Sequence, residues 1–383
     1  MKTNKKFLLL SFWGIIFVVL GHCSGLHKNM FFCNIFPFYS FHMALFIFIS
    51  GYFYKKSPAK KFFVKKTKKI IISYLIWNLI YGIIVNILKN LGVINYGKDL
   101  TLYNIFIAPF MTYSNQFHFN SPAWFLISIY FVQVIYCIID KINIKDYKIN
   151  KYIVFIISSI IASITLKSAL NGNNYGIWIL ITRVSFLFPF YCLGQIYKDL
   201  EKYDKLNNIA YYIILIIVQA ILLQKYVDLT YNLNTMTFKH PYIIYLLSSI
   251  TGILFWLRIS AIMEPYFGEN KIINYIGNNT YHVMMHHMFM FYIVNTFIYA
   301  IYKFTGRFGK FDVTAYKKSI WYVYNKENGA LLLIYVIIGI ALPLLIKYMI
   351  IDKYQINQKF KDLFEKCKKT IIKDDLNKDI PVK

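Results

Sequence analysis

The chain alternates between long apolar stretches and short polar ones. A membrane-spanning helix needs about 20 mostly apolar residues, and about ten stretches of this kind follow one another, none of them containing Asp or Glu. The pattern predicts an all-α polytopic transmembrane helical bundle of about ten spans, and it excludes a soluble protein. The expected spans are residues 7–26, 35–54, 70–88, 122–139, 152–170, 177–197, 208–224, 241–257, 281–302 and 329–346.

Basic residues are unevenly divided between the two sides of this bundle. Most of the 43 Lys and Arg lie in alternate connecting segments, and residues 55–69 alone hold eight lysines. Positively charged loops stay in the cytoplasm, so both termini are predicted to be cytoplasmic. Residues 1–351 are then a membrane domain and residues 352–383 a short charged cytoplasmic tail. The apolar run 100–111, in an external segment, is too short to span and is expected to be a re-entrant or interfacial helix.

Composition supports the membrane interpretation and narrows the partners. The chain is 58% hydrophobic and only 16% charged, yet its formal net charge is +26. Nucleic-acid binding is not expected, because most lysines flank apolar stretches, where they contact anionic lipid headgroups. The lipid bilayer is therefore the expected partner. The first 21 residues resemble a signal peptide, but His22 directly before Cys23 does not fit a lipoprotein cleavage site. We interpret this segment as a retained first helix.

Three ionisable side chains fall at a similar depth in the predicted outer half of the membrane. At about 1.5 Å per residue, His22 lies about 6 Å deep, His42 about 10 Å and Arg183 about 9 Å. Ionisable groups at such depths are costly, and each marks a candidate functional site. Their common level predicts a shared cavity. The predicted spans hold no carboxylate, which weighs against a proton-coupled carrier, since such carriers use Asp or Glu relays.

Two histidines near the ninth predicted span have the spacing that allows a shared metal ion. His282 and His286 are four residues apart, so they lie on one helix face. No third ligand follows nearby in the sequence. We therefore predict no metal site.

Five motifs, in order along the chain, resemble the acyltransferase 3 family of bacterial membrane O-acyltransferases. The resemblance runs from about Phe7 to Met349, and its most specific part is the second motif. The motifs are Ile15–His22, which ends in a histidine; Ser40–Tyr52, which is similar to the Phe-His-Met…Ser-Gly-Tyr signature; Ala123–Leu126; Arg183 with the following Phe188-Pro189-Phe190 and Leu193-Gly194; and Ile276–Tyr281 leading to His286.

The resemblance implies transfer of an acyl group, most often acetyl, from cytoplasmic acyl-CoA to a hydroxyl of an envelope or exported polysaccharide. The expected location is the bacterial inner membrane, with acetyl-CoA as donor substrate and no bound cofactor. Histidine suits the activation of a weak hydroxyl nucleophile near neutral pH. The expected catalytic residues are His22, Arg183 and His42, and the expected substrate-binding residues are Ser50, Trp124 and His286. Both a base role and an acyl-carrier role for His22 remain open.

One position departs from the family pattern. The family places Lys or Arg eleven residues before the first-helix histidine, where this chain has Ser11. Lys5, Lys6 or the lysines of 55–69 are candidates to take over contact with the donor. The alternatives to an enzyme are an exporter of polysaccharide or lipid and a catalytically inactive relative.

Overall fold

The computed structural model describes residues 4–23, 32–112, 116–144, 147–148, 150–309, 311–325 and 328–349. The predicted tail 352–383 lies outside these residues. Within them, nine helices are long and apolar enough to cross a membrane. The chain is thus a multi-pass membrane protein of the all-α class, as the apolar pattern predicts.

The helices follow one another with few other elements between them. The long helices are α1 (Lys5–Cys23), α4 (Ser73–Asn90), α6 (Trp124–Ile139), α7 (Lys151–Leu170), α8 (Ile177–Leu200), α9 (Asn208–Lys225), α10 (Tyr242–Phe267), α12 (Thr280–Thr305) and α14 (Gly329–Lys347). The short ones are α2 (His42–Tyr52), α3 (Ala59–Lys66), α5 (Ala108–Met111), α11 (Lys271–Asn278) and α13 (Val313–Lys318). The two-residue strands β1 (Asn143–Ile144) and β2 (Tyr147–Lys148) pair antiparallel.

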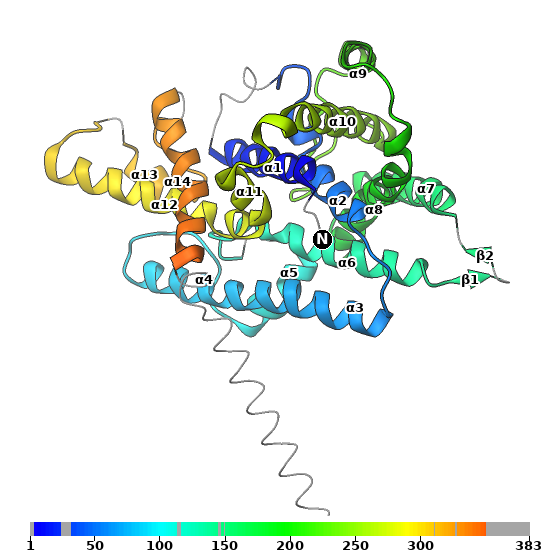
Figure 1. Ribbon diagram of the computed structural model, residues 1–383. Helices are drawn as coiled ribbons and strands as arrows, with labels where there is room; N and C mark the ends of the chain where they lie inside the picture. Colours follow the sequence, from blue (N-terminus) through cyan, green and yellow to red (C-terminus); the bar gives the residue numbers. More distant parts are fainter. Residues whose placement is uncertain are drawn as a thin grey trace, which may run out of the picture.

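The helices form an inner group and an outer group. Helix α1 lies inside and packs against α2, α10, α11, α12 and α14, and 67% of the residues in its apolar stretch are buried. Helices α7 and α9 lie outside α8 and α10 (Figure 1), with only 22% and 17% buried. Their exposed residues are mainly isoleucines, which suits contact with lipid because lipid offers no hydrogen-bond partners. The burial and the contacts of α1 therefore place it at the centre of the bundle.

The second predicted span, 35–54, is shorter than expected. Pro37 precedes a 3-10 turn, Phe38–Ser40, and Phe41 leaves the helical conformation with φ −147°. Helix α2 therefore begins only at His42 and has 11 residues, about 16 Å of a core of about 30 Å. The 3-10 turn before it belongs to the same crossing, because Tyr39 bonds to Gly21 and Tyr52 bonds to Asn4, near opposite ends of α1. The break matters for function, because it places His42 in the first turn of a short buried helix.

The lysine-rich segment 55–69 is a helix over most of its length and not the loop that the charge pattern suggests. Helix α3 begins after Pro58 and continues through a π-helical stretch, Thr67–Ile72, into α4. Lysine is a good helix former, and its long stem keeps the charge in water while the helix enters the membrane. In the run 100–111, a π-helical stretch at Tyr103–Ile107 and α5 form short helical turns, consistent with a segment too short to span.

Helices α2 and α8 approach so closely that glycine is required at their contact. A Cβ on Gly51 would overlap the carbonyl oxygen of Tyr191, and one on Gly194 would overlap that of Phe48. The side chain of Gln195 also bonds to the carbonyl of Gly51. Only glycine allows such a backbone approach. This contact holds α2 in place, together with the residues that it carries.

Gly51→Ala is expected to destabilise the protein by about 1–3 kcal/mol, because α2 and α8 must separate to admit the methyl group. The measurement is the thermal unfolding midpoint of the purified protein in detergent. Gly329→Ala is the control, since a Cβ there meets open space. Equal midpoints for the two variants would contradict the requirement for glycine.

Candidate functional site

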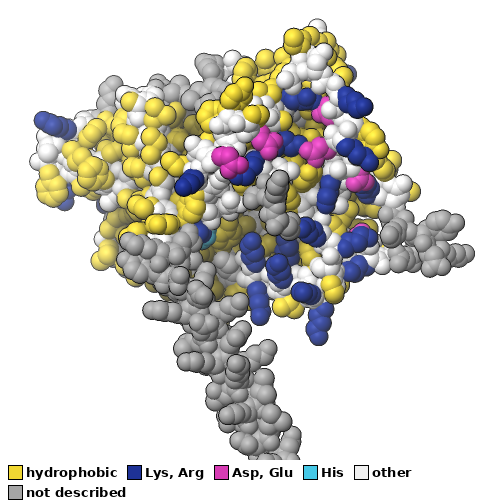
Figure 2. Space-filling model, viewed as in Figure 1, with side chains coloured by type: hydrophobic (Ala, Val, Ile, Leu, Met, Phe, Trp, Pro, Cys, Tyr) yellow, Lys and Arg dark blue, Asp and Glu magenta, His cyan; other side chains and the backbone are white. Residues whose placement is uncertain are grey.

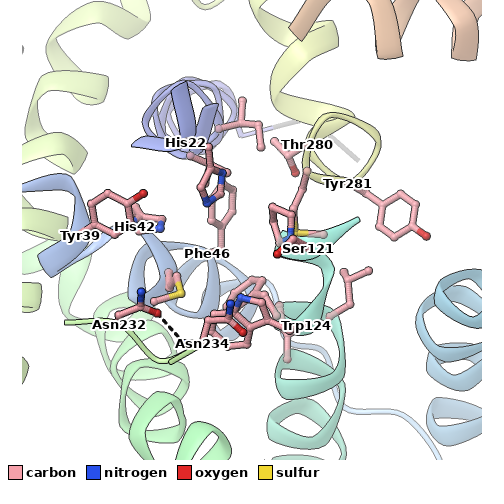
Figure 3. A pocket seen from close by; sticks show the side chains of 18 of the residues that line it. His22, Tyr39, His42, Phe46, Ser121, Trp124, Asn232, Asn234, Thr280 and Tyr281 are labelled. Carbon is pink, nitrogen blue, oxygen red and sulfur yellow. Dashed lines mark hydrogen bonds between the residues drawn. The ribbon is translucent and has the colours of Figure 1, made fainter. Parts of the chain in front are cut away.

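A cavity of about 530 Å³ runs beside α1. Its wall includes Ser11 near one end and His22 at the other, eleven residues apart on the same helix, or about 16 Å. Both apolar and polar side chains line the cavity, and the polar ones include His22, His42 and Asn232 (Figure 3). The remaining wall comes from Ile15, Val18, Tyr39, His42, Met43, Phe46, Ile49, Ser50, Ser121, Pro122, Trp124, Phe125, Leu126, Ile129, Tyr231, Asn232, Asn234, Thr235, Thr280, Tyr281, Met284 and Trp321.

His22 forms a hydrogen-bonded pair with a second histidine. His287 Nδ1 lies 2.8 Å from the carbonyl oxygen of Val283, and a carbonyl only accepts, so this nitrogen carries a proton. In neutral His287 the Nε2 atom is then an acceptor. It lies 2.8 Å from His22 Nδ1, which must donate to it. The chain of bonds fixes one tautomer of His22, whose Nε2 keeps its lone pair.

His42 is oriented by a similar bond. Its Nδ1 lies 2.7 Å from the carbonyl oxygen of Phe38 in the preceding 3-10 turn, so Nδ1 donates and Nε2 accepts. The ring stands edge-on to Tyr39 at a centroid separation of 5.2 Å. Two imidazoles from different helices thus line one cavity, each with its tautomer set by a carbonyl oxygen at the end of its hydrogen bonds.

The structure brings four of the six sequence-predicted site residues to the cavity wall. These are His22, His42, Ser50 and Trp124. Ser50 Oγ accepts a hydrogen bond of 2.7 Å from Gln133. The other two, Arg183 and His286, are not part of this wall.

His286 contacts different neighbours from His287, although the two are adjacent in sequence. Its Nδ1 lies 2.7 Å from the hydroxyl of Tyr81, and its ring stands edge-on to Trp77 at 4.3 Å. Successive helical residues are rotated by about 100°, so the two histidines face different neighbours. The signal that identifies His287 is its helical spacing: Thr280, Met284 and His287 share one face, and the first two line the cavity.

Arg183 lies behind the cavity wall and joins two parts of it. Its guanidinium stacks on the ring of Trp124 at 4.6 Å. It donates to the carbonyl of Leu233 at 3.0 Å and to the carbonyl of Asn234 at 2.9 Å. These contacts position the wall residues Trp124 and Asn234. The geometry supports a positioning role for Arg183, where the sequence predicted a catalytic one.

Arg183→Lys is expected to lower the stability of the protein by about 1–3 kcal/mol, because an ammonium cannot stack on the indole and also reach both buried carbonyls. The check is the thermal unfolding midpoint in detergent. Arg307→Lys, at an exposed position after α12, serves as the control. A midpoint for Arg183→Lys equal to that of the control would show that the contacts are dispensable.

The lysines nearest to Ser11 already have partners. Lys5 pairs with Glu269 at 2.9 Å, and Lys6 pairs with Glu201. Ser11 itself donates to the carbonyl of Phe7 at 2.8 Å. Lys56 in the segment 55–69 likewise pairs with Asp140 at 3.1 Å, so ion pairing alone does not choose among the candidates for the missing basic residue. Figure 2 shows Lys and Arg side chains gathered over α3.

Comparison with known proteins adds a family. No curated protein and no solved structure matches the chain. A family model described as an acyltransferase domain (Acyl_transf_3) matches residues 9–351, which include every described residue that lines the cavity. The chain therefore belongs to the acyltransferase 3 family, as its motifs indicate.

Proposed function

We propose that this membrane acyltransferase is an O-acetyltransferase of the bacterial inner membrane. It uses acetyl-CoA to acylate a hydroxyl of an envelope or exported polysaccharide. The observation that carries the proposal is the His22–His287 pair at one end of a cavity that extends along α1 to Ser11. A base in such a place can receive the hydroxyl of the acyl acceptor at the His22 end of the cavity, and the acyl group can reach it through the apolar passage from the Ser11 end. Acyl-CoA is a substrate here, and no resident cofactor is needed.

The transfer needs a base that returns its proton. His22 Nε2 takes the proton of the acceptor hydroxyl, and the oxygen bonds to the carbonyl carbon of the thioester. The C–S bond then breaks, and the thiolate of coenzyme A takes the proton from His22. While His22 is an imidazolium, its Nδ1–H donates a charge-assisted bond to His287 Nε2. That bond is stronger than in the ground state, so it favours the transition state.

The acyl group has an apolar route to His22. Ile15 and Val18 on α1, together with Phe46 and Met284, line the cavity between Ser11 and His22. The polyanionic part of coenzyme A cannot enter such a passage without a large desolvation cost. It is expected to remain in water at the lysines of α3, whose positive charge attracts phosphate groups.

The purified protein in liposomes, given labelled acetyl-CoA and glycan from the producing cell, tests this function. Label is expected to pass to the glycan, and mass spectrometry is expected to find ester-linked acyl groups that are absent without the protein. In cells with and without the protein, an exporter would change the amount of surface glycan and leave its mass unchanged. An inactive relative would change neither. Label located on His22 by mass spectrometry of the protein, when no glycan is present, would assign His22 as an acyl carrier.

The proposal needs the Ser11 end of the cavity on the cytoplasmic side. A reporter fused after Lys66 is expected to be active in the cytoplasm, and one fused after Asn173 is expected to be active outside. The reason is the excess of lysine at one face of the bundle. Activity of both reporters on the opposite sides would reverse the direction of transfer.

A further inference from the structure

The segment between α9 and α10 forms a hairpin, residues 228–239, at the His22 end of the cavity. Asn232 and Thr237 exchange backbone hydrogen bonds of 3.0 and 2.9 Å. The side-chain oxygen of Asn232 accepts from the backbone N–H groups of Asn234 and Thr235, at 2.9 and 3.1 Å. These bonds close the turn, so its tip has one defined conformation.

The base of the hairpin is fastened by polar contacts. Asp228 pairs with Lys239 at 2.6 Å and accepts from the backbone and hydroxyl of Thr230. Burial acts to raise the pKa of Asp228, but the bonds from Lys239 and Thr230 outweigh it, and the pKa is lowered. A carboxylate whose pKa is lowered in the folded protein adds stability at pH values above its ordinary pKa. That stability is lost as the pH falls through the lowered pKa. The fastening is therefore intact near neutral pH.

The hairpin is also anchored inward. Tyr231 and Leu233 are buried, whereas Asn232 and Thr235 are exposed. Arg183 holds the carbonyls of Leu233 and Asn234 from behind. The alternation puts apolar side chains in the core and polar ones at the cavity. A polar surface held in this way binds a ligand at a lower entropic cost than a flexible loop does.

The side chains of the tip match the chemistry of a sugar. Asn232, Asn234 and Thr235 line the cavity with amide and hydroxyl groups, and the amide nitrogen of Asn232 points into it (Figure 3). Such groups both donate and accept, as sugar hydroxyls do. The indole of Trp321 lies 5.5 Å from the ring of His22 and offers an apolar face. A ring that covers this indole lies within reach of the base.

The charge of the residues that line the cavity restricts the class of ligand further. Among the described residues that line it there is no Asp, Glu, Lys or Arg. A carboxylate or phosphate bound here would lose its hydration without gaining a counter-charge, which is costly. From these observations we infer that the hairpin tip, residues 232–235, and Trp321 form a subsite for an uncharged sugar residue, with Asn232 selecting the acceptor. The inference rests on the proposed function and specifies its acceptor.

Binding without donor tests the subsite. Isothermal titration in detergent compares a neutral galactose trisaccharide with the galacturonic acid trisaccharide, which differs in carrying carboxylates. The neutral sugar is expected to bind at least tenfold more tightly. Asn232→Asp keeps the oxygen that closes the turn and removes the amide donor, so it is expected to weaken binding of the neutral sugar about five- to tenfold. Trp321→Ala is expected to weaken it further, since the apolar face is lost.

Asn171→Asp is the matched control, because this residue lies at the end of α7 and outside the cavity wall, and unchanged binding is expected. Equal or tighter binding of the acidic sugar overturns the inference, and so does the absence of binding of either sugar at millimolar concentration. Hydrolysis of acetyl-CoA by the unaltered protein reports the proposed function separately. Hydrolysis without neutral-sugar binding refutes the subsite alone, and sugar binding without any hydrolysis or transfer refutes the acyltransferase proposal.

Discussion

His22→Ala is expected to abolish acylation of the glycan while the protein remains inserted and folded. Loss of general-base catalysis alone slows a reaction by about 10²- to 10⁴-fold, and loss of a covalent step would cost more. The measurement is the initial rate of label transfer per molecule of folded protein. The folded amount is obtained from the monodisperse peak in size-exclusion chromatography.

His22→Asn separates chemistry from structure. An asparagine amide lies near the former Nδ1 and can still donate to His287 Nε2, but it cannot accept the proton of the substrate. We expect this variant to fold as well as the unaltered protein and to be as inactive as His22→Ala. Near-normal transfer per folded molecule would show that His22 is not catalytic. The enzymatic role would then pass to His42, the other histidine in the cavity wall.

The second large effect is expected at His287. His287→Ala removes the acceptor that fixes the tautomer and the orientation of His22, and a small misplacement of a reacting group can cost about 10²-fold. We expect kcat to fall by about that factor while KM for acetyl-CoA changes little, because His287 is not among the described residues that line the cavity. His287→Gln keeps an acceptor oxygen near the position of Nε2, so partial recovery of kcat is expected.

His286→Ala is the matched control, since it removes the neighbouring imidazole from the same helix. It breaks the bond to Tyr81, so the thermal midpoint is expected to fall while kcat per folded molecule stays within a few-fold. A purely structural role for His287 predicts the same behaviour for both variants. Loss of kcat in His286→Ala with retention in His287→Ala would reverse the assignment made from the geometry.

The two histidines show where prediction from the sequence ends. The motif that leads from Ile276 to His286 directs attention to the right helix, and helical periodicity is available without a structure. Neither says which face of α12 meets α1. Only the packing of the two helices brings His287 to His22, and a rotation of about 100° per residue then excludes His286.

Arg183 shows a similar limit of prediction from membrane depth. Its predicted level in the membrane is similar to that of His22, but depth along one helix leaves the direction of the side chain open. The carbonyls that hold Arg183 come from a hairpin about 50 residues later in the sequence. Sequence patterns carry no signal for that contact, because backbone carbonyls are present at every residue.

The sequence by itself determined the class of the protein, the approximate ends of nearly all its long helices and its family. It could do so because lipid offers no hydrogen bonds, so a lipid-facing span must be a continuous apolar helix that is visible as a run in the sequence. Only the tertiary structure decided that α2 is short, that the lysine-rich segment forms the helix α3, and that these particular polar groups meet at the cavity. Those features depend on contacts between distant segments, which the local pattern of apolar and polar residues does not encode.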